Sequence, residues 1–114
     1  MTQDRNSPPT PLTYQILVAL ADADRHGYGI IKEIEERAGP SSAPSTGALY
    51  LALQRMEEGG LIEDAPGRPE DADARRRYYR ITADGRAVAE AESTRLAELV
   101  AAARSKNLLA GGSA

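Results

Sequence analysis

Apolar side chains recur at helical spacing near the start of the chain. In the stretch 12–23, Tyr14 or Ile16 is followed by Leu17 and Leu20 on the same side of a helix. The segment "DRHGYG" comes next, and its two glycines are typical of a helix break. The pattern predicts one amphipathic helix that ends where this segment begins.

A second amphipathic stretch covers residues 27–39. Ile30 and Ile34 lie on one side of it, whereas lysine and glutamate occupy the other side. Gly39 is followed by Pro40, a pair typical of a helix end, because glycine readily takes up the cap conformation and proline cannot continue the helix. We expect a second helix, and then a turn in "PSSAP".

The third stretch, residues 45–58, carries apolar side chains on two sides. Leu49 and Leu53 belong to a regular inward stripe, and the hydroxyl of Ser45 can cap the first turn. Leu51 falls on the outward side of the same helix, which has almost no charge in its first two turns. An outward leucine in an uncharged surface does not suit a face that is merely solvated.

Two short strands and a long helix complete the pattern. The segments "LIEDA" (61–65) and "RRRYYRIT" (75–82) are typical of a hairpin, joined by a loop rich in proline, glycine and aspartate. Residues 83–109 are rich in alanine, with larger apolar residues at spacings of three, four or their sums, which predicts a final helix.

This order of elements predicts a mainly α fold with a small β-hairpin. Three short helices and a hairpin too small to be stable alone suit a winged helix-turn-helix, in which the hairpin packs on the helices. We expect a flexible N-terminal arm (1–11), a winged helix-turn-helix domain (12–82), a C-terminal dimerisation helix (83–109) and a disordered tail (110–114).

Composition narrows the class of protein. A chain of 114 residues forms one domain, with little room for a large active-site cavity. Its formal net charge is -3, so nucleic-acid binding would depend on local clusters of arginine rather than on total charge. Cysteine is absent, and no apolar run reaches the length of a membrane span, which favours a cytoplasmic protein with no membrane partner.

The start of the third helix has the composition of a surface that reads a DNA groove. Small side chains there allow close approach to base edges, and carboxylates appear only near the C-terminal end of the helix. We predict that Tyr50 hydrogen-bonds a phosphate, Leu51 touches a thymine methyl group and Gln54 pairs with adenine. Ser45 and Thr46 complete the predicted DNA-binding residues of this helix.

The second predicted strand concentrates positive charge. Arg75, Arg76 and Arg77 precede a pair of tyrosines, and Arg80 follows it. Strand alternation lets one tyrosine anchor the strand in the core while the arginines line an edge that contacts phosphates. We therefore predict contacts to the DNA backbone by the three consecutive arginines. The acidic loop tip is expected to lie away from phosphate or to stay mobile in solvent.

The chain resembles the PadR family of transcriptional regulators in four ordered segments. These are "HGYGI" at 26–30, "GALY" at 47–50, "LQRMEEGGLIE" at 53–63 and "RRRYYRITADGR" at 75–86. Each segment is a modest signal alone, whereas the ordered set is specific and covers about residues 12–88.

The resemblance implies a winged-helix DNA-binding domain that forms a homodimer, largely through the C-terminal helix. It implies binding to a palindromic operator in double-stranded DNA, and repression that a small-molecule effector often relieves. By position, the recognition helix of the family corresponds to residues 45–58, its phosphate-contacting tyrosine to Tyr50, and its wing to residues 61–82.

The predicted dimer contacts lie in the last helix. A helix of this length is longer than a small winged domain is wide, so much of it must project. Its apolar stripe then needs a partner that the small core cannot supply. We predict that Leu96, Leu99, Val100 and Ala103 pack against their symmetry mates, which places two recognition helices on half-sites about one turn of DNA apart.

Plain structural explanations exist for several of these residues. Tyr50 could cover the flank of its helix, and Leu51 could pack against the first helix or a partner chain. His26 is the sole histidine and suits a capping or structural role; it lacks the partners that a metal site needs, so we expect no metal.

Two other classes of protein compete with a DNA-binding regulator. An enzyme is poorly supported, because the chain has one histidine, no cysteine, no phosphate-binding Gly-Lys-Ser/Thr loop and no Gly-x-Ser-x-Gly elbow, and no cofactor is expected. A winged-helix module that binds only proteins would show the same apolar pattern, but it has no need of the arginine cluster.

Overall fold

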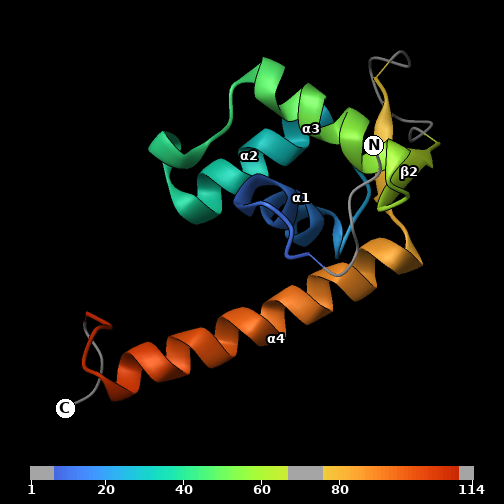
Figure 1. The fold of residues 1–114 in the computed structure, drawn as a ribbon. Helices are drawn as coiled ribbons and strands as arrows, with labels where there is room; N and C mark the ends of the chain where they lie inside the picture. The colour runs from blue at the N-terminus through green and yellow to red at the C-terminus, as the bar shows by residue number, and fades with distance from the viewer. Residues whose placement is uncertain (1–6, 67–75, 111–114) are drawn as a thin grey trace.

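Four α-helices and a small antiparallel sheet build the fold (Figure 1). The computed structural model describes residues 7–66 and 76–110. The elements in chain order are α1 (Pro11–Leu20), β1 (Arg25–His26), α2 (Gly27–Ala38), the short 3-10 helix η1 (Pro40–Ser42), α3 (Thr46–Glu58), β2 (Ile62–Ala65), β3 (Tyr78–Ile81) and α4 (Ala83–Ser105). The mainly α winged helix-turn-helix with an added C-terminal helix is thereby confirmed.

Each α-helix begins at a side chain that caps it. Thr10, Ser45 and Thr82 each accept a hydrogen bond from a backbone N–H of the first turn. The ring of His26 does the same for α2, with Nδ1 3.0 Å from the backbone nitrogen of Gly29. Capping of this kind satisfies donors that have no partner inside the helix. The predicted capping role of His26 is confirmed.

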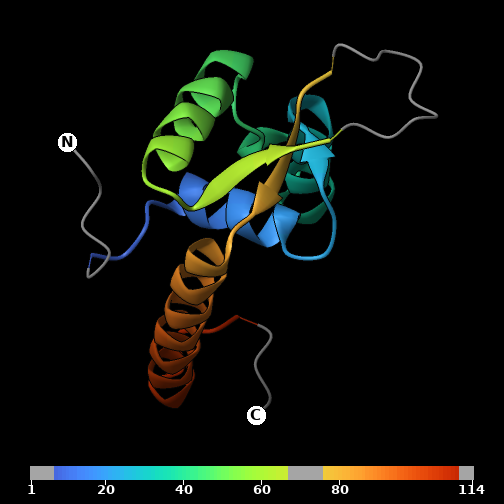
Figure 2. The same ribbon diagram turned by 90° about the vertical axis from the view of Figure 1, so that its right-hand side faces the viewer.

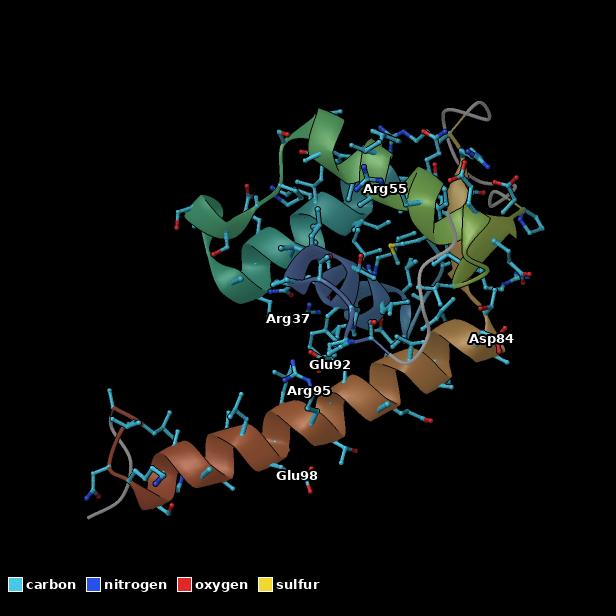
Figure 3. All side chains as sticks on the ribbon, in the orientation of Figure 1. Arg37, Arg55, Asp84, Glu92, Arg95 and Glu98 are labelled. Carbon is cyan, nitrogen blue, oxygen red and sulfur yellow. The ribbon has the colours of Figure 1, made fainter. Side chains whose placement is uncertain are left out.

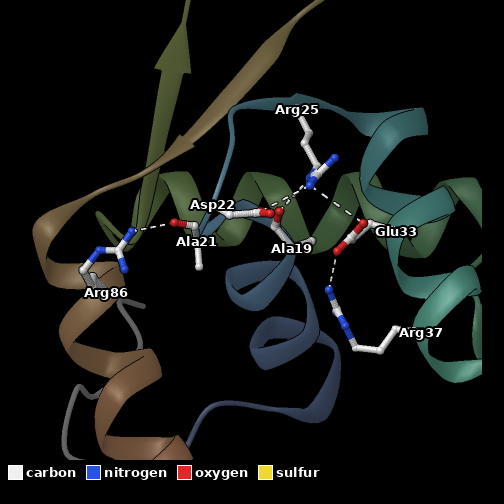
Figure 4. Close-up of polar contacts among 7 residues, drawn as sticks. All are labelled: Ala19, Ala21, Asp22, Arg25, Glu33, Arg37 and Arg86. Carbon is white, nitrogen blue, oxygen red and sulfur yellow. Dashed lines mark hydrogen bonds and ion pairs between the residues drawn. The ribbon is translucent and has the colours of Figure 1, made fainter.

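Two arginines from other elements donate hydrogen bonds to backbone carbonyls at the C-terminal end of α1 (Figure 4). Arg25 donates from Nε to the carbonyl oxygen of Ala19 at 2.7 Å, and Arg86 donates from Nη2 to that of Ala21 at 2.8 Å. The last carbonyls of a helix lack intrahelical partners and carry the negative end of its dipole. These contacts therefore hold β1 and the start of α4 against the end of α1.

The sheet has three strands in the order β1-β3-β2, all antiparallel (Figure 2). Ile62 pairs with Ile81, and His26 pairs with Tyr78. The sequence predicts only the hairpin of β2 and β3. It misses β1 because a strand of two residues in a polar segment shows no alternation, and only its pairing with β3 makes it a strand.

The core lies where the first three helices meet the sheet. It consists of Ile16, Leu17, Ala19, Leu20, Ile30, Ile34, Leu49, Leu53, Met56, Leu61, Ile62 and Tyr79. The alternation argument places one tyrosine of β3 inward, whereas both are buried. Tyr79 joins the core, and Tyr78 packs edge-on against His26 with ring centroids 5.3 Å apart.

The first turn of α4 fits closely against the start of β2. Thr82 donates from its hydroxyl to the carbonyl oxygen of Gly60 at 2.7 Å. Gly85 is buried, and a Cβ at this position would lie 2.1 Å from the carbonyl oxygen of Leu61. Because backbone cannot move aside as a side chain can, only glycine allows α4 to begin here.

The rest of α4 lies along α1 and then continues past the domain (Figure 1). Tyr14 of α1 and Ser93 of α4 share a hydrogen bond of 2.7 Å between their hydroxyls. The helix ends at Ser105 rather than at the predicted residue 109. Asn107 takes a positive φ of 62°, and the N–H of Leu108 bonds the carbonyl of Ala103 at 2.9 Å, a left-handed cap that stops the helix.

The predicted N-terminal arm and C-terminal tail are described only in part. Residues 1–6 of the predicted arm and 111–114 of the predicted tail lie outside the described residues. Within the predicted arm, Pro9 is buried and Pro11 is already the first residue of α1. Across the two described ranges, no helix is both long and apolar enough to cross a membrane.

Candidate nucleic-acid interface

The first turn of α3 presents small side chains on a helix held by its own cap. The hydroxyl of Ser45 accepts from the backbone nitrogen of Ala48 at 3.1 Å. Thr46, Gly47 and Ala48 are all exposed, and among the described residues nothing comes within 4 Å of a Cβ built on Gly47. An outside surface can therefore approach the backbone of this turn closely.

The next turn of α3 exposes the residues that the sequence assigns to base and phosphate contact. Tyr50 is 47% exposed, Leu51 is 50% exposed, and Gln54 is exposed as well. Leu51 is thus not buried against α1, which was one structural explanation of it. The inward stripe of the same helix, formed by Leu49 and Leu53, is fully buried.

Tyr50 leans across the beginning of α2. A Cβ built on Gly27 would lie 2.3 Å from the phenolic oxygen of Tyr50 and 2.7 Å from its Cζ. Burial is the main cause that raises the pKa of Tyr79 on β3, and Glu57 and Tyr50 act in the same direction in a smaller way. The ring of Tyr50 therefore lies against the beginning of α2 while it remains partly exposed on α3.

Arg55 is a cation of α3 that the predicted site residues do not include. It is exposed and lies on the side of the domain away from α4 (Figure 3). Its position four residues after Leu51 puts it on the same outward flank of the helix. Helical spacing from the outward leucine could have identified it.

Arg77 in the wing is held by carboxylates of the same chain. Its Nε lies 2.5 Å from Oδ1 of Asp64 on β2, and its Nη2 lies 2.6 Å from Oε2 of Glu57 on α3. The guanidinium also lies over the ring of Tyr79, 5.1 Å from the centroid. Arg77 therefore joins the end of α3 to both strands of the wing.

The electrostatics of this cluster agree with its geometry. The hydrogen bond from Arg77 holds the pKa of Asp64 below its ordinary value. The same bond is the main cause that raises the pKa of Arg77. All three charged groups remain in contact with water, so the pairs contribute little to folding stability but fix the direction of the guanidinium.

The other arginines near the wing differ in their surroundings. Arg76 is exposed, with Nη1 2.8 Å from Nε2 of His26. Arg80 forms an ion pair of 3.0 Å with Asp24, which precedes β1. Arg75, the third predicted phosphate contact, lies outside the described residues. Of the predicted arginines that are described, Arg76 is the one without a carboxylate partner among the described residues.

The predicted dimer residues lie on the part of α4 that leaves the domain. Leu99 is 58% exposed and Val100 is 42% exposed, whereas Leu96 and Ala103 are half-buried. Just before them, the carboxylate of Glu92 faces α1 and receives two hydrogen bonds from Arg95, at 2.8 and 2.6 Å (Figure 3). The exposed apolar surface begins where the packing against α1 ends.

No metal site accompanies these surfaces in the ranges 7–66 and 76–110. Within them, no group of three or more histidine, aspartate or glutamate side chains is arranged to hold a metal ion.

The sequence of residues 16–91 matches the family model described as the transcriptional regulator PadR-like family. The chain belongs to the PadR-like family. The matched range begins in α1, contains the helix-turn-helix and the wing, and ends in the first part of α4. The resemblance seen in the four sequence segments is thereby confirmed.

Two curated proteins show the extent of sequence similarity. Uncharacterized protein X of Lysinibacillus sphaericus is 39% identical over 72 residues, which cover 63% of this chain and 65% of that protein. A 37.1 kDa protein of transposon TN4556 from Streptomyces fradiae, also uncharacterised, is 38% identical over 84 residues, covering 74% of this chain and 22% of that protein. The chain thus spans less than two thirds of either relative.

Solved structures show the same architecture. A PadR family transcription regulator from Clostridium difficile R20291 superposes with a TM-score of 0.73 at 28% identity, over 82% of this chain and 95% of that one. Bacillus subtilis PadR, solved in complex with operator DNA, superposes with a TM-score of 0.60 at 22% identity, over 69% of this chain and 44% of that one. The second likeness shows the fold alone.

Proposed function

We propose that this protein is a sequence-specific DNA-binding transcriptional regulator that inserts the start of α3 into the major groove. The observation that carries the proposal is the exposed, carboxylate-free surface formed by the first turns of α3. Such a surface lets a helix approach base edges without repelling phosphate. Bacillus subtilis PadR, which has the same fold, was solved in complex with operator DNA, and this supports DNA binding by the present chain.

Each predicted residue has a distinct role in the proposal. Leu51 and Gln54 face base edges, and Tyr50 faces a phosphate beside the groove. Ser45 and Thr46 lie at the helix start, where backbone N–H groups also favour phosphate. Arg76 and Arg75 supply sequence-independent contacts from the wing, and the exposed Arg55 is a further candidate for a phosphate contact.

Arg77 takes a different role in this proposal. The sequence predicts a phosphate contact, but the guanidinium is already engaged by two carboxylates of the chain. We assign it to holding the wing against α3, so that its loss changes the position of the wing rather than the number of phosphates neutralised.

A binding measurement separates this proposal from a protein-binding module. Duplexes that the protein selects from a random library should share a motif, and binding to them should weaken as salt rises, with a log-log slope of about -0.9 per phosphate contact. A winged-helix module that binds only proteins would select no motif and would show no salt-dependent affinity for duplex DNA.

We also propose a homodimer through the projecting part of α4. Leu99 and Val100 expose apolar surface on a helix that continues past its own domain (Figure 1), and Leu96, about one turn earlier, is half-buried. A symmetric helix pair would cover this surface and present two recognition helices to half-sites of a palindrome. Light scattering at micromolar concentration should therefore show a dimer.

The double variant Leu96→Glu/Leu99→Glu tests the dimer. It should be monomeric and should lose operator binding by a factor on the order of 100 or more, because the two half-sites are no longer linked. Thr94→Glu, an exposed change on the same helix outside this apolar surface, is the matched control. A double variant that stays dimeric would show that another surface forms the dimer.

Repression, with relief by a small-molecule effector, is the finer form of the proposal and rests on the family resemblance. A bound dimer would block a promoter that contains its site. A reporter gene behind the selected motif should fall in expression when the protein is present, and the Leu96→Glu/Leu99→Glu variant should restore it. Rising expression with the intact protein would instead indicate an activator.

A further inference from the structure

We infer that Gly27, at the start of α2, positions the ring of Tyr50 for DNA contact and is glycine for that reason. The inference rests on the proposed function. Gly27 is buried, and the three atoms nearest to a Cβ built on it all belong to the far end of the Tyr50 side chain, at 2.3, 2.7 and 3.2 Å. The space that a methyl group on residue 27 would fill is thus occupied by the phenol of Tyr50 on α3.

The backbone of Gly27 gives no other reason for a glycine. Its φ lies outside the positive range, which within the described residues contains only Gly39 and Gly60 among the glycines. Alanine would suit the position better, since glycine is the poorer helix former. The close approach of Tyr50 is the feature that alanine would disturb.

The position of the Tyr50 ring depends on Gly27, because the phenol occupies the space that a Cβ at position 27 would fill. The ring of Tyr50 is almost half exposed, so it has room to move away from a larger residue at position 27. A methyl group on Gly27 would require the phenolic oxygen to move by about an ångström or more to restore ordinary contact. That movement carries the phenolic hydroxyl away from α2, and a displaced hydroxyl loses its hydrogen bond to phosphate in the proposed complex.

The predicted consequence is a variant with an intact fold and a misplaced Tyr50. The clash in Gly27→Ala involves the end of a flexible side chain rather than backbone, so α2 should keep its place. Gly29 supplies the matched control two residues further along the helix. A Cβ on Gly29 meets its nearest neighbour, Cε1 of His26, at 3.5 Å, which is an ordinary contact.

The experiment measures binding of the full chain to one duplex DNA of fixed random sequence, because a phosphate contact does not depend on base sequence. Tyr50→Phe removes the hydroxyl and should weaken binding about tenfold, the usual effect of losing a hydrogen bond to a charged group. Gly27→Ala should weaken binding by a similar factor, and Gly29→Ala should leave it unchanged. In the Tyr50→Phe background, Gly27→Ala should have much less effect than in the wild type.

Two further readouts distinguish a positioning role from a general loss of structure. The thermal midpoint of Gly27→Ala should not fall below that of Gly29→Ala, and the ring resonances of Tyr50 should shift in Gly27→Ala alone. A lowered midpoint, or full binding by Gly27→Ala when Tyr50→Phe binds weakly, would overturn the inference. If Tyr50→Phe binds normally, the phosphate contact itself is wrong, and if the wild type binds no duplex, the proposed function fails with it.

Discussion

The beginning of α3 and the wing both present exposed side chains, but they use charge in opposite ways. The first turns of α3 hold no charged side chain, and Thr46, Gly47, Ala48, Tyr50, Leu51 and Gln54 are all exposed. The wing is dense in arginine, yet Arg77 and Arg80 are each paired with carboxylates of the same chain. The uncharged start of α3 is therefore available to a partner, whereas Arg77 and Arg80 of the wing already form ion pairs within the chain.

This difference teaches that a count of charges does not locate a binding surface. Charge in a sequence is counted per residue, whereas a phosphate responds to the net charge at its own position. Arg77 beside Glu57 and Asp64 brings no net positive charge to the surface. Four predictions follow this contrast, from the largest expected effect to the smallest.

A carboxylate placed on the uncharged surface should abolish its function without harming the fold. Ala48→Glu puts a glutamate three residues after the Ser45 cap, where a glutamate can bond back to the cap and stabilise the helix. DNA affinity should fall by on the order of several kcal/mol through repulsion by phosphate. Gel shift and thermal melting measure the two effects.

Ala48→Gln is the control for the charge, since glutamine can close the same capping box without repelling phosphate. Its affinity should remain far above that of Ala48→Glu. Equal losses in the two variants would mean that size rather than charge matters there, and normal binding by Ala48→Glu would exclude this turn from the interface.

Replacing Gln54 should affect the choice of sequence more than the affinity for DNA in general. Gln54→Ala removes an exposed amide that can pair with adenine, and should relax discrimination at one or two base pairs by about 1–3 kcal/mol. Binding constants for a panel of single-base operator variants provide the measurement. A uniform loss across the panel would make Gln54 a residue that positions the helix instead.

Arg76 and Arg77 form a matched pair, since they are neighbours of the same type and differ in their partners. Arg76→Ala should reduce the log-log salt slope by about 0.9, the share of one phosphate contact, while Arg77→Ala should weaken binding and leave the slope unchanged. Titrations at several salt concentrations decide this. Equal changes of slope would show that both arginines, or neither, neutralise phosphate.

The smallest effect is a titration within the wing. Because the hydrogen bond from Arg77 is the main cause that lowers the pKa of Asp64, Arg77→Ala should raise that pKa toward its ordinary value, as measured by NMR of the carboxyl group. A lowered pKa means that the folded state favours the charged carboxylate. This small stabilisation is present above the ordinary pKa and is lost as pH falls through the lowered one. Arg76→Ala should leave the titration unchanged.

The sequence alone predicted the order of helices, the hairpin and the inward stripe of α3. These features follow from local rules. Helical spacing determines which residues share a buried face, and the pair Gly39-Pro40 ends a helix whatever its tertiary surroundings. The outward direction of Leu51 and Gln54 follows in the same way, because it is fixed once Leu49 and Leu53 point inward. The family resemblance came from ordered segments of the same local kind.

Tertiary structure decided the features that join distant parts of the chain. Strand β1 exists only because β3 lies beside it. Both tyrosines of β3 are buried, Tyr78 against the ring of His26 and Tyr79 in the core. The partners of Arg77 lie 20 and 13 residues away in sequence, and Gly27 meets a ring from another helix. Such pairings leave no periodic trace, since side-chain spacing records which face a residue occupies but not which element that face will meet.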